Sequence, residues 1–310
     1  MNHWRIALIT FLLTATFSGQ TDASRPRILG VAHIALYSSD LAKARAFYED
    51  FLGFQELATL QRDDGSVRIA FVKINDKQYV ELFTDAPKDD GQLNHIALYT
   101  DNAQQMRDYL AAHGIKVPVT VPKGKTGNYN FTIQDPDGHT VEIVQYLPDS
   151  LTGTNQGKLV PAGRISTRIM HVGFLVRNLE SSMKFYHDVL GFREFWRGSS
   201  NGTQLSWVNM RVPNGDDYVE FMLYTGTPSA QERGGKNHLS LEVPAIEKAI
   251  QDLEQRPARK LYGREIKTQV GKNRKRQANL FDPDGTRVEL MEPNTVDGQP
   301  ALSSTAPPPQ

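Results

Sequence analysis

Residues 40–54 read DLAKARAFYEDFLGF, and residues 178–192 read NLESSMKFYHDVLGF. In the first of these stretches, apolar residues recur at helical spacing on one face: Leu41, Ala44, Phe47, Tyr48 and Phe51. Each stretch starts with a capping residue, Asp40 or Asn178, and ends with a glycine, Gly53 or Gly191, suited to a left-handed helix end. Two copies of one helix indicate that the chain contains a duplicated domain.

Histidines and glutamates repeat outside these helices, each in an apolar segment typical of a strand. They alternate along the chain in the order His33, Glu81, His95, Glu142, His171, Glu220, His238 and Glu289. The second four follow the first four at spacings of 138 to 147 residues, and loop insertions in a duplicated domain produce such a drift. Imidazoles and carboxylates at equivalent points of a repeat suggest metal sites.

The repeat also predicts the organisation of the chain. The motif Asp-Pro-Asp-Gly occurs at 135–138 and at 282–285, and each copy predicts a turn before the strand that carries Glu142 or Glu289. The pattern is one strand, one helix and three strands, four times over, which predicts an α+β fold. The predicted parts are two domains at 28–146 and 167–292, a Gly-, Pro-, Thr- and Asn-rich linker at 147–166, and a disordered tail at 293–310.

Composition narrows the classes of function. The hydrophobic content of 39% and the charged content of 23% are ordinary for a soluble globular protein. The formal net charge is zero, so no overall field favours a nucleic-acid or membrane partner. The chain has no cysteine, which excludes disulfides, thiolate nucleophiles and zinc–thiolate sites.

Residues 1–23 are predicted to be a signal peptide. His3 and Arg5 precede an apolar run at 6–17, and Thr21 and Ala23 are small residues suited to cleavage. A run of 12 residues is too short to span a bilayer. We therefore expect export to the periplasm or the extracellular space, without stable membrane insertion after cleavage.

The helix ends FYEDFLGF and FYHDVLGF and the closures DPDGHTVEI and DPDGTRVEL resemble the vicinal oxygen chelate superfamily, which includes glyoxalases, bleomycin resistance proteins and extradiol dioxygenases. The resemblance implies four βαβββ modules that pair into two cupped-sheet domains, with a metal held inside a cup. It covers nearly all of residues 28–292, and it is more specific for the fold than for the reaction.

Carried over to this chain, the resemblance implies two sets of metal ligands. One set is His33, Glu81, His95 and Glu142, and the other is His171, Glu220, His238 and Glu289. Some relatives pair modules across domains or subunits, which would instead group His33, Glu81, His238 and Glu289, and group His95, Glu142, His171 and Glu220. The sequence does not distinguish these groupings, nor a monomer from a homodimer.

The expected cofactor is a divalent metal ion, namely Fe²⁺, Mn²⁺, Zn²⁺, Ni²⁺ or Co²⁺. Four ligands in an octahedron leave two positions for a small substrate that chelates through adjacent oxygens. Glu142 and Glu289 are the candidate general bases, because a ligand glutamate can detach and accept a proton. A basic loop at 271–276 offers Lys272, Arg274 and Arg276 as weaker candidates for binding a substrate anion.

Three functions follow from the resemblance. The first is a metal-dependent, glyoxalase-like lyase or isomerase, which the complete His-Glu-His-Glu sets favour. The second is an extradiol dioxygenase using His171, His238 and Glu289. Against it, Asn279 and Thr132 stand where ring-cleaving relatives place a tyrosine, and no histidine lies between His238 and Glu289. The third is a small-molecule-binding protein without catalysis, like the bleomycin resistance proteins.

Overall fold

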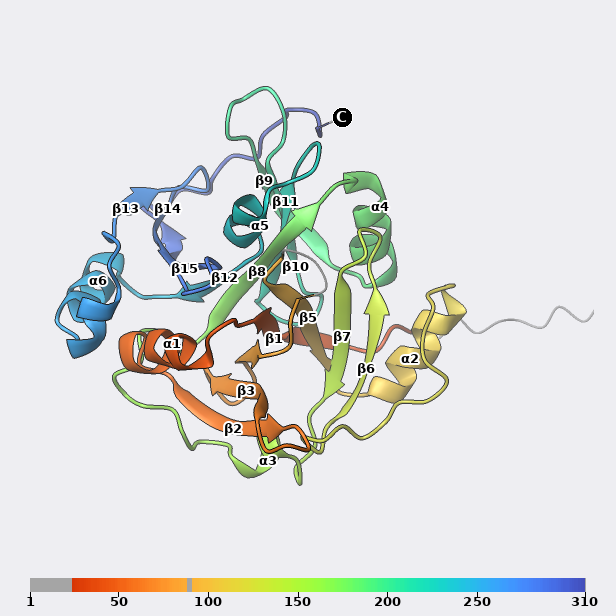
Figure 1. Cartoon of the computed structure of the whole chain (residues 1–310). Coiled ribbons are helices and arrows are strands. Elements are labelled where there is room, and N and C mark those ends of the chain that lie inside the picture. Colours follow the sequence, from red (N-terminus) through yellow and green to blue (C-terminus); the bar gives the residue numbers. More distant parts are fainter. Residues whose placement is uncertain (1–23, 88–90, 310) are drawn as a thin grey trace, which may run out of the picture.

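The computed structural model describes residues 24–87 and 91–309, and it contains two mixed β-sheets with few, short helices (Figure 1). The predicted signal peptide lies outside the described residues. The first sheet has seven strands in the order β2-β3-β4-β1-β5-β7-β6. Its strands are β1 (Ile28–Tyr37), β2 (Gln55–Gln61), β3 (Val67–Lys73), β4 (Tyr79–Phe83), β5 (Leu93–Thr100), β6 (Tyr129–Gln134) and β7 (Thr140–Gln145).

The second sheet has eight strands in the order β13-β14-β15-β12-β8-β11-β10-β9. They are β8 (Ile169–Val176), β9 (Arg193–Gly198), β10 (Trp207–Arg211), β11 (Tyr218–Leu223), β12 (His238–Glu242), β13 (Thr268–Val270), β14 (Lys275–Phe281) and β15 (Arg287–Thr295). The two sheets confirm the predicted α+β fold of paired modules. The second module departs from the expected plan, because in the described residues α2 is followed by two strands and an isolated bridge between Lys123 and Tyr129.

The helices lie between the strands of each module. The first domain has α1 (Leu41–Arg45), the π-helix η1 (Ala46–Phe51) and α2 (Ala103–Ala112), and α3 (Leu151–Thr154) follows it. The second domain has α4 (Leu179–Met183), the π-helix η2 (Lys184–Val189), α5 (Ala230–Lys236), α6 (Ile246–Glu254) and the 3₁₀ helix η3 (Pro257–Leu261). No helix of the described residues is long and apolar enough to cross a membrane.

The repeated helix at 40–54 is confirmed, with one difference in its hydrogen bonding. Asp40 accepts a hydrogen bond from the Lys43 N–H at 3.1 Å, and Gly53 ends the helix with φ +80°. The first five residues are α-helical, but the next six form a π-helix, in which the Leu52 N–H donates to the Phe47 carbonyl. The α4–η2 pair repeats this plan in the second domain.

Each cup forms within one domain. In the first domain β1 and β5 run antiparallel at the centre of the sheet, with β4 parallel to β1 and β7 parallel to β5. In the second domain β8 and β12 take the central places, flanked by β11 and β15. The first and last strands of the paired modules therefore share one sheet, and the cross-domain ligand groupings do not form.

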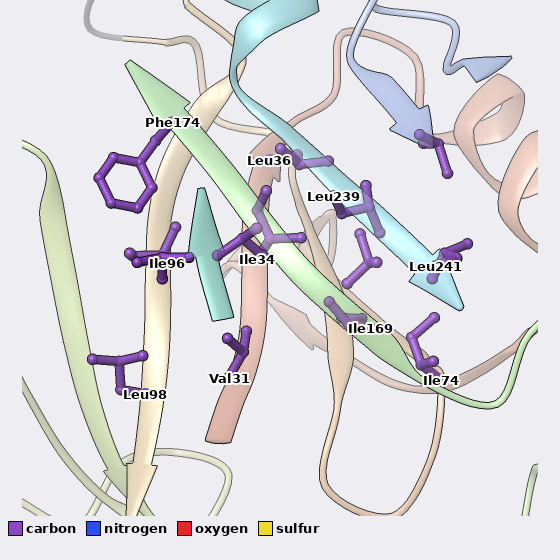
Figure 2. Packing of buried hydrophobic residues seen from close by; sticks show 14 of the residues in the cluster. Val31, Ile34, Leu36, Ile74, Ile96, Leu98, Ile169, Phe174, Leu239 and Leu241 are labelled. Carbon is purple, nitrogen blue, oxygen red and sulfur yellow. The ribbon is translucent and has the colours of Figure 1, made fainter. Parts of the chain in front are cut away.

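One apolar core joins the two domains. Ile34 and Ile96 of the first sheet and Phe174 and Leu239 of the second belong to the same buried cluster (Figure 2). Successive residues of a strand point to opposite faces, so the face of β1 that carries Ile34 packs in this core, and His33 points to the other face. The cups therefore open on the sides of the two sheets that face away from the shared core.

Matching polar contacts link the domains. Tyr48 donates to Asp282 at 3.2 Å, and Tyr186 donates to Asp135 at 3.1 Å, so each repeated helix binds the Asp-Pro-Asp-Gly turn of the other domain. Burial raises the pKa of Asp282 to about 7.

The segment at 147–166 does more than connect the domains. Lys73, whose side chain is fully buried, donates to the carbonyls of Asn155 and Lys158 at 2.6 and 2.8 Å and to Asp76 at 2.6 Å. These bonds hold α3 against the first domain, where Leu151 and Thr152 line the cup.

The last residues also differ from the expectation. Disorder is predicted from 293 onward, whereas β15 continues to Thr295. The chain then runs past β9, where the Ser304 N–H donates to the Arg197 carbonyl and the Leu205 N–H donates to the Pro307 carbonyl. Backbone hydrogen bonds of this kind do not depend on side-chain type, so a composition rich in Pro, Ser and Thr does not reveal them.

Candidate metal centres

The first cup brings together four predicted ligands from four strands. His33 lies on β1, Glu81 on β4, His95 on β5 and Glu142 on β7, and each is at least nine-tenths buried. The two imidazoles face each other with Nε2 atoms 2.9 Å apart. Glu142 Oε2 lies 3.1 Å from His95 Nε2 and 3.6 Å from His33 Nε2.

Glu81 closes the set on the opposite side. Its oxygens lie 3.5 Å from His33 Nε2 and 4.0 Å from His95 Nε2. One donor atom from each of His33, Glu81 and His95 falls within 4.8 Å of the others. Adjacent ligands of an octahedral ion with bonds of about 2.1 Å lie about 3.0 Å apart, so this spacing fits a divalent transition metal.

Neighbouring amides orient two of these ligands. His95 Nδ1 lies 2.7 Å from the Asn94 side-chain oxygen, so Nδ1 carries the proton and Nε2 is left as a lone pair that points into the cup. The Asn130 amide donates to Glu142 Oε1 at 2.8 Å, which leaves Oε2 directed at the imidazoles. The second layer of contacts thus holds donor atoms toward one point.

The charges of the first cup favour a cation. Burial raises the pKa of Glu81, whereas for Glu142 the nearby imidazoles of His33 and His95 outweigh burial and lower its pKa. Burial alone would lower the pKa of His33, but Glu81 and Glu142 outweigh burial and raise it. The carboxylates thus attract positive charge to the point where the imidazoles meet.

The second cup repeats the four ligands. His171 lies on β8, Glu220 on β11, His238 on β12 and Glu289 on β15. The imidazole Nε2 atoms are 3.0 Å apart, Glu289 lies 3.5 Å from His171, and Glu220 lies 3.5 Å from His238. The donor atoms of His171, Glu220 and His238 also fall within 4.8 Å of one another.

A fifth side chain distinguishes the second cup. Arg287 Nη2 lies 2.8 Å from His238 Nε2, the atom that would bind an ion. Arg287 is the first residue of β15, two residues before Glu289, and the corresponding first residue of β7 is Thr140, two residues before Glu142. The Thr140 hydroxyl accepts a hydrogen bond from Gln134 at 3.0 Å.

The guanidinium changes the electrostatics around the second set. Burial, followed by the charge of Arg287, lowers the pKa of both His171 and His238. Burial and the nearby Glu289 raise the pKa of Glu220 to about 8. The imidazoles and Glu220 beside the arginine are thus shifted toward their neutral forms, whereas in the first cup Glu142 and His33 are shifted toward their charged forms.

Sequence reasoning missed three contributors to these cups, and one signal could have found the most important. Asn94 and Asn130 orient ligands, and Arg287 contacts one. Side chains alternate along a strand, so the residue two positions before each ligand glutamate is expected on the same face. Comparing Thr140 with Arg287 on that basis would have indicated that the cups differ.

The basic side chains of the loop at 271–276 take different positions in the structure. Lys272 lines the cavity of the second cup, and its role in substrate binding stays a prediction. Arg274 instead pairs with Asp297, and Arg276 pairs with Glu247 at 3.1 Å. Neither arginine lines the cavity, because nearby carboxylates hold both elsewhere.

Both cups contain a cavity of small-molecule size. The first measures about 330 Å³, and besides the four ligands its wall includes apolar residues from β2, β3 and β4: Leu57, Leu60, Ile69, Phe71 and Phe83. The second measures about 290 Å³ and is lined by Trp196, Trp207, Lys272, Arg287 and Met291, among others. All four predicted ligands of the first cup line its cavity, whereas in the second cup only Glu220 and Glu289 do, because His171 and His238 are fully buried.

Comparison with known proteins agrees with this architecture. The family model described as the glyoxalase/bleomycin resistance protein/dioxygenase superfamily matches residues 30–143 and 168–290. Glyoxalase I of Saccharomyces cerevisiae is 21% identical over 217 residues, which are 64% of this chain and 63% of the yeast protein. The chain thus spans slightly less than two thirds of that relative.

Two solved structures share the fold over nearly the whole chain. The Mn(II)-bound glyoxalase from Novosphingobium aromaticivorans aligns with a TM-score of 0.65 and 18% identity, over 92% of this chain and 89% of that one. The 2,3-dioxygenase LapB from Pseudomonas sp. KL28 aligns with a TM-score of 0.65 and 18% identity, over 90% and 98%.

Proposed function

Because this chain belongs to the glyoxalase/bleomycin resistance protein/dioxygenase superfamily, we propose that it is a divalent-metal-dependent, glyoxalase-like lyase or isomerase. Its substrate would be a small molecule chelated through adjacent oxygens. We assign the metal to the first cup, with His33, Glu81, His95 and Glu142 as ligands. The observation that carries this proposal is the convergence of these four buried donors, and in the described part of the chain no basic side chain forms a hydrogen bond with either imidazole.

The metal, when bound, would polarise a carbonyl oxygen and stabilise an enediolate. The residues of the chain bind and orient the reactants around it. The Asn94 and Asn130 amides fix the directions of His95 and Glu142, so those two ligands are held rigidly. The apolar wall and α3 exclude water from the substrate.

Glu81 is better placed than Glu142 to move a proton. Glu142 lies 3.1 Å from one imidazole and accepts an amide hydrogen bond, whereas Glu81 comes no closer than 3.5 Å to either imidazole. Among the described residues, no amide or hydroxyl donates a hydrogen bond to Glu81. We therefore transfer the base role predicted for Glu142 to Glu81, which can leave its ligand position and accept a proton from a carbon next to a carbonyl.

The wall of the cavity limits the substrate. A volume of about 330 Å³ with aliphatic and aromatic sides suits a compact molecule that has one oxygen-rich edge and one apolar side. We keep export as part of the proposal. In an exported setting, a substrate other than a glutathione adduct is expected.

Proton exchange provides a direct test. Metal-stripped protein would be reloaded with Mn²⁺, Ni²⁺, Zn²⁺ or Co²⁺ and incubated in D₂O with a panel of small α-hydroxy carbonyl compounds. NMR would follow the exchange of the C–H hydrogen on the hydroxyl-bearing carbon next to the carbonyl. We expect metal-dependent exchange, lost in Glu81→Gln and retained in the exposed control Glu180→Gln. Metal binding without exchange of any compound would contradict the lyase or isomerase and favour a binding protein.

The ring-cleaving dioxygenase is the second candidate, because LapB shares the fold over 98% of its length. Two positions argue against it here. Thr132 lies opposite Glu142 and Asn279 lies opposite Glu289, so the tyrosine expected beside the metal in ring-cleaving relatives is replaced in both cups. Oxygen uptake with Fe²⁺ and a set of catechols would distinguish the two reactions, since a lyase consumes none.

A further inference from the structure

The position of Arg287 gives the second cup a different role from the first. Its Nη2 lies 2.8 Å from His238 Nε2. A guanidinium has only donors and stays charged in proteins, so it uses the lone pair that a metal ion would need. An ion at that point would also lie a few ångströms from a fixed positive charge, which would repel it.

Unsatisfied donors surround the same cavity. Trp196 is 6% exposed, and within the described residues its indole N–H and the Arg287 Nε–H have no hydrogen-bond partner. Both side chains line the cavity. A buried donor left without a partner is destabilising, so a ligand that presents acceptor oxygens would be stabilised by these groups.

Basic side chains lie beside the carboxyl groups of the second cup. Lys272 and Arg287 line the cavity together with Glu220 and Glu289. Trp207 and Met291 offer apolar surface beside them.

We propose that Arg287 takes the place of the metal ion in the second cup, and that this cup binds a small organic carboxylate instead of a metal. The carboxylate would accept hydrogen bonds from the Arg287 fork, a pairing in which two parallel bonds form, and from the Trp196 indole. Its carbon skeleton would pack against Trp207 and Met291. This inference concerns the second cup and does not depend on the reaction proposed for the first.

The tryptophans make the second cup observable by itself. The chain has three, and Trp4 lies in the predicted signal peptide, so Trp196 and Trp207 supply the fluorescence of a Trp4→Phe background, and both line this cavity. In that background, titration with benzoate and acetate should change the fluorescence. Titration of metal-stripped protein with Co²⁺ should quench it little.

Arg287→Thr is the decisive variant, because threonine is what the first domain has at this position. We expect it to weaken benzoate binding at least tenfold, to gain strong quenching by Co²⁺, and to raise the bound metal by one equivalent per chain by elemental mass spectrometry. Arg287→Gln, which keeps a polar side chain, serves as a second variant, and circular dichroism shows that each variant is folded.

Two outcomes would overturn the proposal. One is stoichiometric quenching by Co²⁺ in the background protein, which would place a metal beside Trp196. The other is no response to either carboxylate, or equal affinity in the background protein and in Arg287→Thr. Failure of the first cup to bind metal would leave the expected gain of one equivalent unchanged, so the two proposals fail separately.

Discussion

The two cups of this chain contain the same four types of predicted ligand, and they differ in the side chains next to those ligands. In each, two imidazole Nε2 atoms meet at 2.9 or 3.0 Å between two glutamates. In the first cup, the side-chain amides of Asn94 and Asn130 form hydrogen bonds with His95 and Glu142. In the second, Arg287 contacts His238 from the side of the cavity. The comparison teaches that a ligand set defines a metal site only together with the charges that face it.

The cups also differ in their covers. Residues that follow the first domain return over the first cup, where Leu151 and Thr152 reach the cavity. The loop between β13 and β14 contributes Lys272 and Asn273 to the second cavity. The two cups thus have different surroundings, as the proposed division between a metal ion and an organic carboxylate requires.

Removing one imidazole at a time should reveal the largest difference in metal affinity between the two cups. His95→Ala should lower metal affinity by more than the ~100-fold that loss of an outer contact costs, because it removes a direct ligand. His238→Ala should leave metal affinity unchanged. Competition with a chelating dye measures both, and equal losses in the two variants would contradict the assignment of the metal to the first cup.

Moving the arginine to the first cup is the next test. Thr140→Arg places a guanidinium two residues before Glu142, as in the second domain. We expect metal affinity to fall at least about tenfold, since a flexible arginine relieves only part of the repulsion. Thr140→Gln is the uncharged control. Full metal binding by Thr140→Arg would show that an arginine at this position does not exclude an ion.

The cover of the first cup can be loosened without touching its ligands. Lys73→Met leaves the carbonyls of Asn155 and Lys158 without their buried donor, and we expect a loss of about 3 kcal/mol in unfolding free energy. Lys77→Met, at an exposed position nearby, should change it by less than about 0.5 kcal/mol. Urea unfolding measures both, and similar small losses would mean that Lys73 does not anchor the segment.

Stability of the metal-free protein should fall with rising pH through Glu220. Its pKa is about 8 in the fold and 4.5 when unperturbed, so the folded state holds the proton longer. The associated stability is present below pH 4.5 and is lost as pH rises to about 8. Glu220→Gln should remove this loss, so the stability of the variant relative to the parent should rise between pH 4.5 and pH 8. A parallel pH profile for both proteins would show that Glu220 is charged throughout.

Removing the contacts that join the domains should give the smallest losses of stability, and the two losses should be nearly equal. Tyr48→Phe and Tyr186→Phe each remove one hydrogen bond to an aspartate of the other domain, and each should cost about 1 kcal/mol. Thermal unfolding measures the pair. A difference above about 1 kcal/mol would show that the two copies of this contact are not equivalent.

Much of the fold follows from the sequence because the controlling interactions are local. Asp40 and Asn178 cap helices within three residues, and Gly53 and Gly191 have the positive φ angles that end them. The eight repeated ligands also come together as two sets of four, since strand periodicity and the repeat place them at equivalent points.

Other features depend on contacts between distant residues. The choice of β5 as the partner of β1, which decides the grouping of ligands, is a long-range pairing that periodicity does not contain. The reach of Arg287 depends on its side-chain direction. The role of α3 depends on Lys73, which lies 82 and 85 residues from the carbonyls it binds.

The most direct test of the account is an anomalous-scattering map from crystals of the protein loaded with Co²⁺ or Zn²⁺. We predict one peak in the first cup, about 2.1 Å from the Nε2 atoms of His33 and His95, and none between His171 and His238. A peak of equal height in the second cup, or a single peak there, would contradict the division of roles between the two copies.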